Sequence, residues 1–141
     1  MAETLRFHYE VDGDNFTSAG AASVEVKRKL RQLGFPTETI RRVSIAMYEG
    51  EINMVVHARG GVADVYVEPN CITIVLADQG PGIPDVGLAM QEGYSTAPDN
   101  IRALGFGAGM GLPNMKRYTD EMKIDTEVGK GTTVTMKVYV S

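Results

Sequence analysis

The sequence predicts an α/β (α+β) fold: a two-layer sandwich in which helices cover one face of a mixed, largely antiparallel sheet. Three observations lead to this prediction. Segments with strand-like alternation are interleaved with segments of helical periodicity, and further strand segments follow one another across short turns. The 141 residues, of which 43% are hydrophobic and 23% charged, suit one compact domain spanning residues 1–141.

The first part of the chain predicts a strand followed by two helices. Residues 4–11 alternate apolar and polar side chains, which is the period of a strand with one buried face. Helical spacing then extends from residue 15 to about residue 33, where a Gly-Phe-Pro sequence ends it. Thr37 or Thr39 can cap the second helix, which continues to a glycine pair.

Strand signals dominate the rest of the chain. Four further strands are expected in two hairpins: 62–69 with 71–78, and 123–128 with 132–140. Between the hairpins, residues 79–111 are rich in glycine and proline and have little periodicity, which at this length indicates a functional loop. A helix is expected at 112–122, directly after this loop.

The composition argues against several classes of protein. The net charge of −4 gives no general attraction to nucleic acid or to an anionic membrane, and the basic stretch at 27–32 is expected to be a solvated helix face. The single cysteine, Cys71, excludes an internal disulfide and is expected to be a packed core thiol in a reducing compartment. With no leader and no apolar run of membrane-spanning length, the expected location is the cytoplasm.

A line of polar residues in the second helix needs an explanation. In YEGEINMVVHARGG, residues 48–61, the spacing of four places Glu49, Asn53 and His57 along one face of a helix. Such a line is usually a solvated stripe. Here apolar residues flank it, so much of the helix is expected to be buried and the polar line calls for another role.

The first glycine cluster, DQGPGIP, follows an apolar strand. An aspartate at the end of a buried strand is costly unless it is hydrogen-bonded, and Asp78 stands at that position. Because Gly80 and Gly82 have no side chains, a flat ligand could approach the backbone while Asp78 accepts a hydrogen bond from an exocyclic amine. The alternative is an ordinary Asp-Gly turn between strand and loop.

The second cluster, GFGAGMGLPNMKR, opens the next helix. Alternate glycines let successive N–H groups point inward, and the partial positive charge of a helix N-terminus also favours phosphate. The spacing matches neither the dinucleotide fingerprint nor the P-loop. A flexible hinge is the alternative for these glycines: Gly105, Gly107, Gly109 and Gly111.

Taken together and in this order, EGEIN, DQGPG and GAGMGL resemble the N, G1 and G2 boxes of the ATPase superfamily that includes gyrase, a class of heat-shock chaperones, histidine kinases and MutL. GKGTTV, at 129–134, resembles the closing Gly-Thr strand of that superfamily. The short chain and YEGEINMVVHA look most like the anti-sigma-factor serine kinases and the stressosome switch kinases. The resemblance covers residues 5–139 and implies the Bergerat-type, histidine-kinase-like ATPase fold.

The resemblance implies roles for the polar line. Asn53 matches the Mg²⁺ ligand, and one amide oxygen is adequate because magnesium is usually held by few protein groups together with phosphates and waters. Glu49 matches the general base that takes the proton of an attacking hydroxyl. His57 lies a further turn along the helix and is expected to be a packing histidine.

The resemblance also implies an adenine and phosphate site. Asp78 would accept a hydrogen bond from the adenine amine, with Thr132, or less favourably Thr133, beside it. The glycines fall into two groups by implied role: Gly80 and Gly82 for the approach of the base, and Gly107, Gly109 and Gly111 for N–H contacts to phosphates. The loop between the clusters would be an ATP lid, in which Arg102, Ser95 and Thr96 are either nucleotide contacts or ordinary loop residues.

Two functions follow as alternatives from the resemblance. The first is a protein serine/threonine kinase that uses Mg-ATP, releases ADP and acts as a regulatory switch on an anti-sigma-factor antagonist (STAS-type) partner. The second is a nucleotide-dependent module that sequesters a sigma factor or a regulatory phosphatase with little turnover. Glu49 favours the kinase, since binding of ATP does not require a base. A homodimer is an open possibility, and no nucleic acid or membrane partner is expected.

Overall fold

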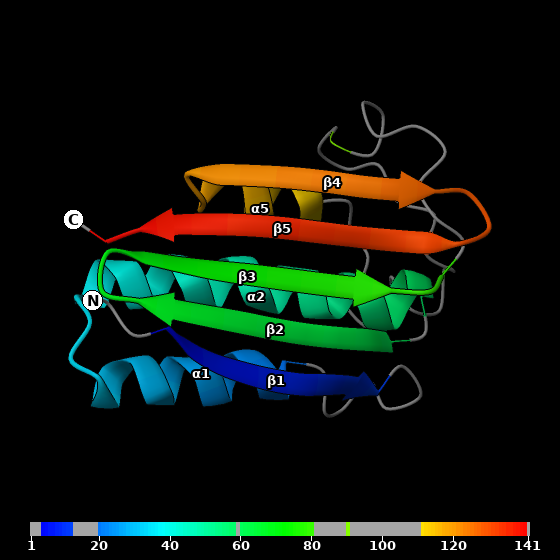
Figure 1. The fold of residues 1–141 in the computed structure, drawn as a ribbon. Helices are drawn as coiled ribbons and strands as arrows, with labels where there is room; N and C mark the ends of the chain where they lie inside the picture. The colour runs from blue at the N-terminus through cyan, green and yellow to red at the C-terminus, as the bar shows by residue number, and fades with distance from the viewer. Residues whose placement is uncertain (1–3, 13–19, 59, 81–89, 91–110, 141) are drawn as a thin grey trace, which may run out of the picture.

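A computed structural model describes residues 4–12, 20–58, 60–80, 90 and 111–140. These residues form five strands and three helices, labelled as in Figure 1. In chain order they are β1 (Leu5–Asp12), α1 (Ala21–Gln32), α2 (Thr37–Ala58), β2 (Gly60–Glu68), β3 (Cys71–Asp78), α5 (Gly111–Arg117), β4 (Glu121–Glu127) and β5 (Gly131–Tyr139).

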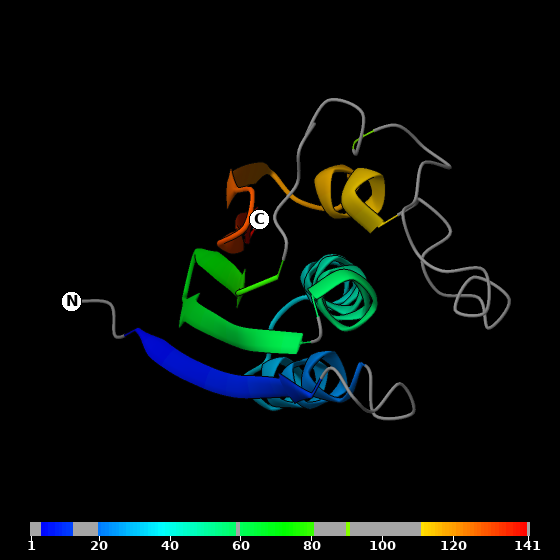
Figure 2. The same cartoon turned by 90° about the vertical axis from the view of Figure 1, so that its right-hand side faces the viewer.

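The five strands form one sheet in the order β1-β2-β3-β5-β4 (Figure 1). Every neighbouring pair is antiparallel, so the parallel pairing that a mixed sheet requires does not occur among the described strands. The three helices lie side by side on one face, with α2 between α1 and α5 (Figure 2). The two-layer α/β sandwich predicted from the sequence is therefore confirmed, with the largely antiparallel sheet being wholly antiparallel where it is described.

The core lies between the sheet and the helix layer. Because side chains alternate across a strand, every second residue of the central strands points toward the helices and is buried, while the residues between them face the open side of the sheet. The fully buried apolar side chains with the largest volumes come from both layers: Val26, Leu30, Val43, Met47, Val65, Ile72, Ile74, Met115, Met136 and Val138.

The first helix differs in part from the prediction. Helical spacing suggested a start at residue 15, whereas α1 begins at Ala21 after Gly20, whose positive φ of 94° is not helical. Residues 13–19 lie outside the described part of the chain. Within α1, Val24 is 67% exposed, and Lys27 and Arg28 are exposed as expected for a solvated face.

The helix expected at 112–122 ends earlier, at Arg117, and β4 begins at Glu121. Asp120 explains the change of direction. Its N–H donates to the carbonyl of Lys137 (2.8 Å), its Oδ2 accepts from the N–H of Tyr139 (2.7 Å), and its Oδ1 lies 3.1 Å from the Arg42 guanidinium. The chain is thus already paired with β5 at a point where the sequence alone still permits a helix.

Cys71 is a free thiol that is only half-buried, so the prediction of a packed core thiol was wrong. It lies on the sheet face opposite the buried Ile72, where its Sγ is 3.9 Å from Thr73 Oγ1. Within the described residues, no helix is both long and apolar enough to cross a membrane.

Candidate functional site

Helix α2 carries Glu49 and Asn53 one turn apart, and both side chains are half-buried. The Nδ2 of Asn114, on α5, donates to Oε1 of Glu49 at 3.4 Å. Because residues four apart share a face of a helix, the two residues lie on the side of α2 that faces α5, the helix that the second glycine cluster opens. The polar line predicted from the sequence is not a solvated stripe at Glu49 and Asn53. His57 lies in α2, but its side chain is outside the described set.

Burial raises the pKa of Glu49 above its ordinary value of 4.5. The hydrogen bond from Asn114 acts in the opposite direction without cancelling the shift. A carboxylate with a raised pKa is a stronger base than an exposed glutamate, which suits a group that must accept a proton from a substrate hydroxyl.

Asp78 ends β3 with its side chain on the helix-covered face, in register with Thr132 of β5. Its Oδ1 accepts hydrogen bonds from the N–H of Gly80 (2.9 Å) and from the N–H of Thr132 (3.2 Å). The bond to Gly80 is the Asp-Gly turn that the sequence left open as an alternative. Both bonds use Oδ1, so neither occupies Oδ2, and the turn orients the carboxylate rather than excluding a ligand.

Two glycines on the neighbouring strands let the backbone approach Asp78 closely. A Cβ on Gly131 would lie 2.2 Å from the carbonyl oxygen of Asp78, and a Cβ on Gly61 would lie 3.1 Å from the Asp78 Cα. The sequence predicted Gly61 as part of the stop of the second helix and Gly131 as part of a turn, and a close approach to Asp78 was not predicted for either. Both glycines directly precede a predicted strand, and glycine in a strand often marks close backbone approach.

Thr132, rather than Thr133, shares the face of Asp78. Thr132 is 8% exposed, and its Oγ1 lies 2.9 Å from Thr126 Oγ1. Thr133 pairs with Ala77 and points to the opposite face of the sheet. The structure therefore brings Asp78, Gly80 and Thr132 together at one end of the sheet.

Several predicted site residues lie outside the described residues. They are Gly82, Gly107 and Gly109, together with Arg102, Ser95 and Thr96 of the expected lid. Gly111 is described and is the first residue of α5. The expected contacts of the glycines with phosphate therefore remain predictions.

Glu51 is a buried charged residue for which the sequence predicted no role. It is 2% exposed and accepts hydrogen bonds from three backbone N–H groups at the beginning of α1. Burial raises the pKa of Glu51, although the bonds from Ser23, Ala22 and Gly20 act in the opposite direction. In the sequence, the signal for a role of Glu51 was a charged residue among the apolar positions of a helix expected to be buried.

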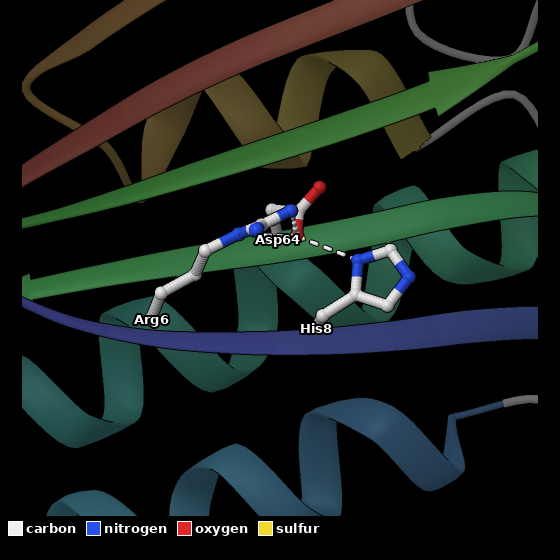
Figure 3. Close-up of polar contacts among 3 residues, drawn as sticks. All are labelled: Arg6, His8 and Asp64. Atoms are coloured by element: carbon white, nitrogen blue, oxygen red, sulfur yellow. Dashed lines mark hydrogen bonds and ion pairs between the residues drawn. The ribbon is translucent and has the colours of Figure 1, made fainter.

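A second polar cluster lies on the open face of the sheet, away from the helices (Figure 3). Nδ1 of His8 is 2.7 Å from Oδ1 of Asp64, and the Arg6 guanidinium donates to the same oxygen at 2.9 Å. Burial alone would raise the pKa of Asp64, but the bonds from His8 and Arg6 outweigh it and hold the pKa below its ordinary value of 3.8. The cluster joins β1 to β2 and does not contact Glu49 or Asp78.

The lowered pKa of Asp64 predicts a small loss of stability in acid. The ionised carboxylate is favoured by the folded state, so its contribution is present above pH 3.8 and is lost as the pH falls through the lower, folded-state pKa. Because His8 and Arg6 are about half exposed, the contribution should be under about 1 kcal/mol.

Urea unfolding at pH 6 and at pH 3 would test this prediction. Wild type should lose more stability than Asp64→Asn across that interval. Asp125→Asn is a matched control, since Asp125 is 61% exposed and lies 3.6 Å from the ammonium group of Lys123. Identical pH dependence in wild type and Asp64→Asn would contradict the assignment.

The described residues contain no group of three or more His, Cys, Asp or Glu side chains that could hold a metal ion alone. On α2, the half-buried amide of Asn53 offers one oxygen to an ion. Such a donor fits an ion like Mg²⁺, which takes most of its oxygen ligands from phosphates and water. It does not fit a structural transition-metal site, which needs a full set of protein ligands.

Known proteins share both sequence and fold with this chain. The family model described as the histidine kinase-like ATPase domain matches residues 15–138. The anti-sigma F factor of Clostridium acetobutylicum is 31% identical over 138 residues, which cover 94% of this chain and 90% of that protein. The serine/threonine-protein kinase RsbT of Bacillus subtilis is 33% identical over 110 residues, 74% of this chain and 75% of its own.

Two solved structures have the same fold at low sequence identity. One contains the RsbU and RsbW domains of Rv1364c from Mycobacterium tuberculosis, with a TM-score of 0.65 and 17% identity over 96% of this chain; the match spans 32% of that larger chain. The other is the mycobacterial sensor histidine kinase MprB, with a TM-score of 0.54 and 18% identity over 96% of this chain and 98% of that chain.

Proposed function

The chain belongs to the histidine kinase-like ATPase family, and from this premise we propose that it is an ATP-dependent protein serine/threonine kinase. The relatives support this proposal, because they include a serine/threonine-protein kinase and several anti-sigma F factors. In this proposal, residues 1–141 form one catalytic domain that acts in the cytoplasm.

The observation that carries the proposal is the environment of Glu49. It is a half-buried carboxylate with a raised pKa, one turn before Asn53, on the side of α2 that faces the beginning of α5. A module that only bound nucleotide would not need a base at this position.

We assign the nucleotide contacts as follows. Oδ2 of Asp78, which neither of its hydrogen bonds to Gly80 and Thr132 occupies, accepts a hydrogen bond from the adenine amine. Asn53 would hold Mg²⁺ through one amide oxygen, which suits an ion that is usually bound by few protein groups. When bound, Mg²⁺ neutralises charge on the phosphates. In this proposal, Gly80 and Gly82 would serve the approach of the base, and Gly107, Gly109 and Gly111 would serve contacts with the phosphates.

Glu49 then takes part in the transfer. The hydroxyl oxygen of an acceptor serine or threonine forms a bond to the γ-phosphorus, and the bond between that phosphorus and the bridging oxygen breaks, which releases ADP. Glu49 accepts the hydroxyl proton as the new bond forms. Positioning and electrostatics contribute most of the rate enhancement in such reactions, so Glu49 assists a reaction that the nucleotide contacts have already oriented.

The acceptor that we propose is an anti-sigma-factor antagonist of the STAS type. The names of the relatives favour a partner in this kind of pathway, since they include both anti-sigma F factors and a kinase. A second candidate function rests on the same names: the chain sequesters a sigma factor or a regulatory phosphatase, with slow phosphate transfer or none. Either activity is compatible with a homodimer.

Transfer of labelled phosphate from ATP to a partner protein distinguishes these two functions. Partners are captured from the native cytoplasm with and without ATP, and each is then incubated with the chain, Mg²⁺ and labelled ATP. We expect label on a serine or threonine of a captured antagonist. Capture of a partner without any transfer of label would favour the sequestering module, and absence of ATP binding would refute both functions.

Asp78 should determine the preference for adenine over guanine. Its carboxylate accepts from the amine of adenine, whereas guanine presents a carbonyl oxygen at that position and is repelled. Asp78→Asn should weaken binding of ADP by about 2 kcal/mol, because a charge-assisted hydrogen bond is lost. Calorimetry with ADP and GDP measures both effects, and Asp125→Asn serves as a control on the opposite face. Equal affinity of wild type for ADP and GDP would contradict the role of Asp78.

A further inference from the structure

The carboxylate of Glu51 binds the beginning of α1 from the interior of the protein. Its Oε2 accepts from the N–H of Gly20 (3.1 Å) and of Ala22 (3.2 Å), and its Oε1 accepts from the N–H of Ser23 (2.6 Å). These are N–H groups that the start of a helix leaves without an intrahelical partner. The N-cap Gly20 offers no side chain, and the first turn of α1 has no acidic residue. Glu51 therefore supplies from α2 the capping group that α1 lacks.

The contact between α2 and the start of α1 is also sterically close. A Cβ on Gly20 would lie 2.6 Å from Cε1 of Tyr48, so the Tyr48 ring packs directly on this residue. Tyr48 and Glu51 are three residues apart on α2 and share one face of it. That face of α2 is thereby held against α1.

The opposite side of α2 carries the proposed site. Glu49 and Glu51 are two residues apart, which on an α-helix separates their directions by about 200°. Glu49 contacts Asn114 of α5, while Glu51 contacts α1, and α2 lies between these two helices (Figure 2). Gly50, between them in sequence, packs toward Leu76 and Met115: a Cβ there would lie 2.0 Å from Leu76 Cδ1 and 3.3 Å from Met115 Sδ.

We infer that Glu51 is a positioning residue: its hydrogen bonds to α1 fix the rotation of α2 about its axis and thereby set where Glu49 and Asn53 lie. Rotation of α2 would separate a buried carboxylate from its three donors and leave all of them unsatisfied, which opposes such a movement. Small displacements of catalytic groups reduce rates strongly, so a fixed rotation matters for transfer. The inference rests on the proposed function of Glu49 and Asn53. It assigns to Glu51 no contact with nucleotide.

The experiment compares two variants at the same helix start. Glu51→Gln is nearly isosteric but replaces one acceptor oxygen with an amide donor. Ser23→Ala is the control: it removes the Ser23 hydroxyl, which bonds the Gly20 carbonyl (2.8 Å) and also helps to lower the pKa of Glu51, but it leaves the three backbone donors to Glu51 in place. For wild type and both variants, the affinity for ADP is measured in EDTA and with Mg²⁺, beside thermal unfolding and, where a partner is in hand, the transfer rate.

The expected result is a selective loss. The EDTA affinity depends on Asp78, which β3 and β5 hold, so it should stay within about threefold in both variants. The gain in affinity on adding Mg²⁺ depends on α2 and should fall by about tenfold or more in Glu51→Gln alone, together with the transfer rate. If Glu51 has a purely structural role, both variants should have a lower melting temperature. In the folded variants, the increase in ADP affinity on adding Mg²⁺ should then equal that of wild type.

The outcomes separate this inference from the proposed function. If wild type shows no Mg²⁺-dependent gain, the proposed function of Asn53 is wrong. If Mg²⁺ raises the ADP affinity of wild type and of folded Glu51→Gln equally, only the positioning role of Glu51 is overturned. Glu51→Asp, which keeps the charge but is one methylene shorter, provides the same comparison if Glu51→Gln does not fold.

Discussion

Glu49→Gln is expected to slow phosphate transfer to a partner serine or threonine by about a hundredfold or more, while the affinity for ADP changes little. Glutamine keeps the size and shape of the side chain and can still contact Asn114, so the packing between α2 and α5 should persist. What is lost is the ability to accept a proton. Single-turnover transfer of labelled phosphate, beside nucleotide titrations, measures the two effects separately.

The pH dependence of transfer adds a second readout on Glu49. The base must be ionised, so the rate should fall as the pH falls through its pKa, which burial places above 4.5. Removal of the Asn114 bond by Asn114→Ala should move this acidic limb to higher pH, because that bond lowers the pKa. Glu38→Gln, an exposed position at the start of the same helix, is the control. Unchanged transfer by Glu49→Gln would remove the catalytic role.

The elements with strong periodicity could be predicted from the sequence, and the termini of other elements could not. Residues 71–78 are an almost continuous apolar run between two turn signals, and they form β3 with the predicted bounds. The end of α5 was misplaced because it depends on Asp120 and its bonds to Arg42 and Tyr139, which are distant in sequence. The start of α1 was misplaced for the same reason, since Gly20 is held by Glu51 from another helix.

The candidate site was predicted to the extent that its residues occur in short motifs. Asp78 and Gly80 are two residues apart and make a local turn, so the sequence could indicate it. The bond from Thr132 to Asp78 joins positions on different strands, and only the resemblance to a known family suggested their proximity. Glu51 lies within EGEIN, but the resemblance implied no role for it. Its role depends on the packing of α1 against α2, which periodicity does not specify.

Asn53→Ala should remove most of the gain in nucleotide affinity that Mg²⁺ provides, about tenfold or more, and should lower the transfer rate at the same time. The amide is the ligand that we assign on α2, and loss of one oxygen leaves the ion held by phosphates and water alone. The affinity for ADP in EDTA should be nearly unchanged, since Asp78 is independent of this residue. For Glu49→Gln we expect the opposite pattern: the nucleotide affinity is kept and the phosphate transfer is lost.

Calorimetric titrations of ADP with Mg²⁺ and with EDTA test the prediction for Asn53, and circular dichroism confirms that the variant is folded. Asn70→Ala is the matched control, because Asn70 is exposed in the turn between β2 and β3, at the opposite end of these strands from Asp78. It makes the same chemical change without touching α2, so both affinities should match wild type. If Mg²⁺ raises the ADP affinity of Asn53→Ala as much as that of wild type, the ion is held elsewhere. The division of roles between Glu49 and Asn53 would then be wrong.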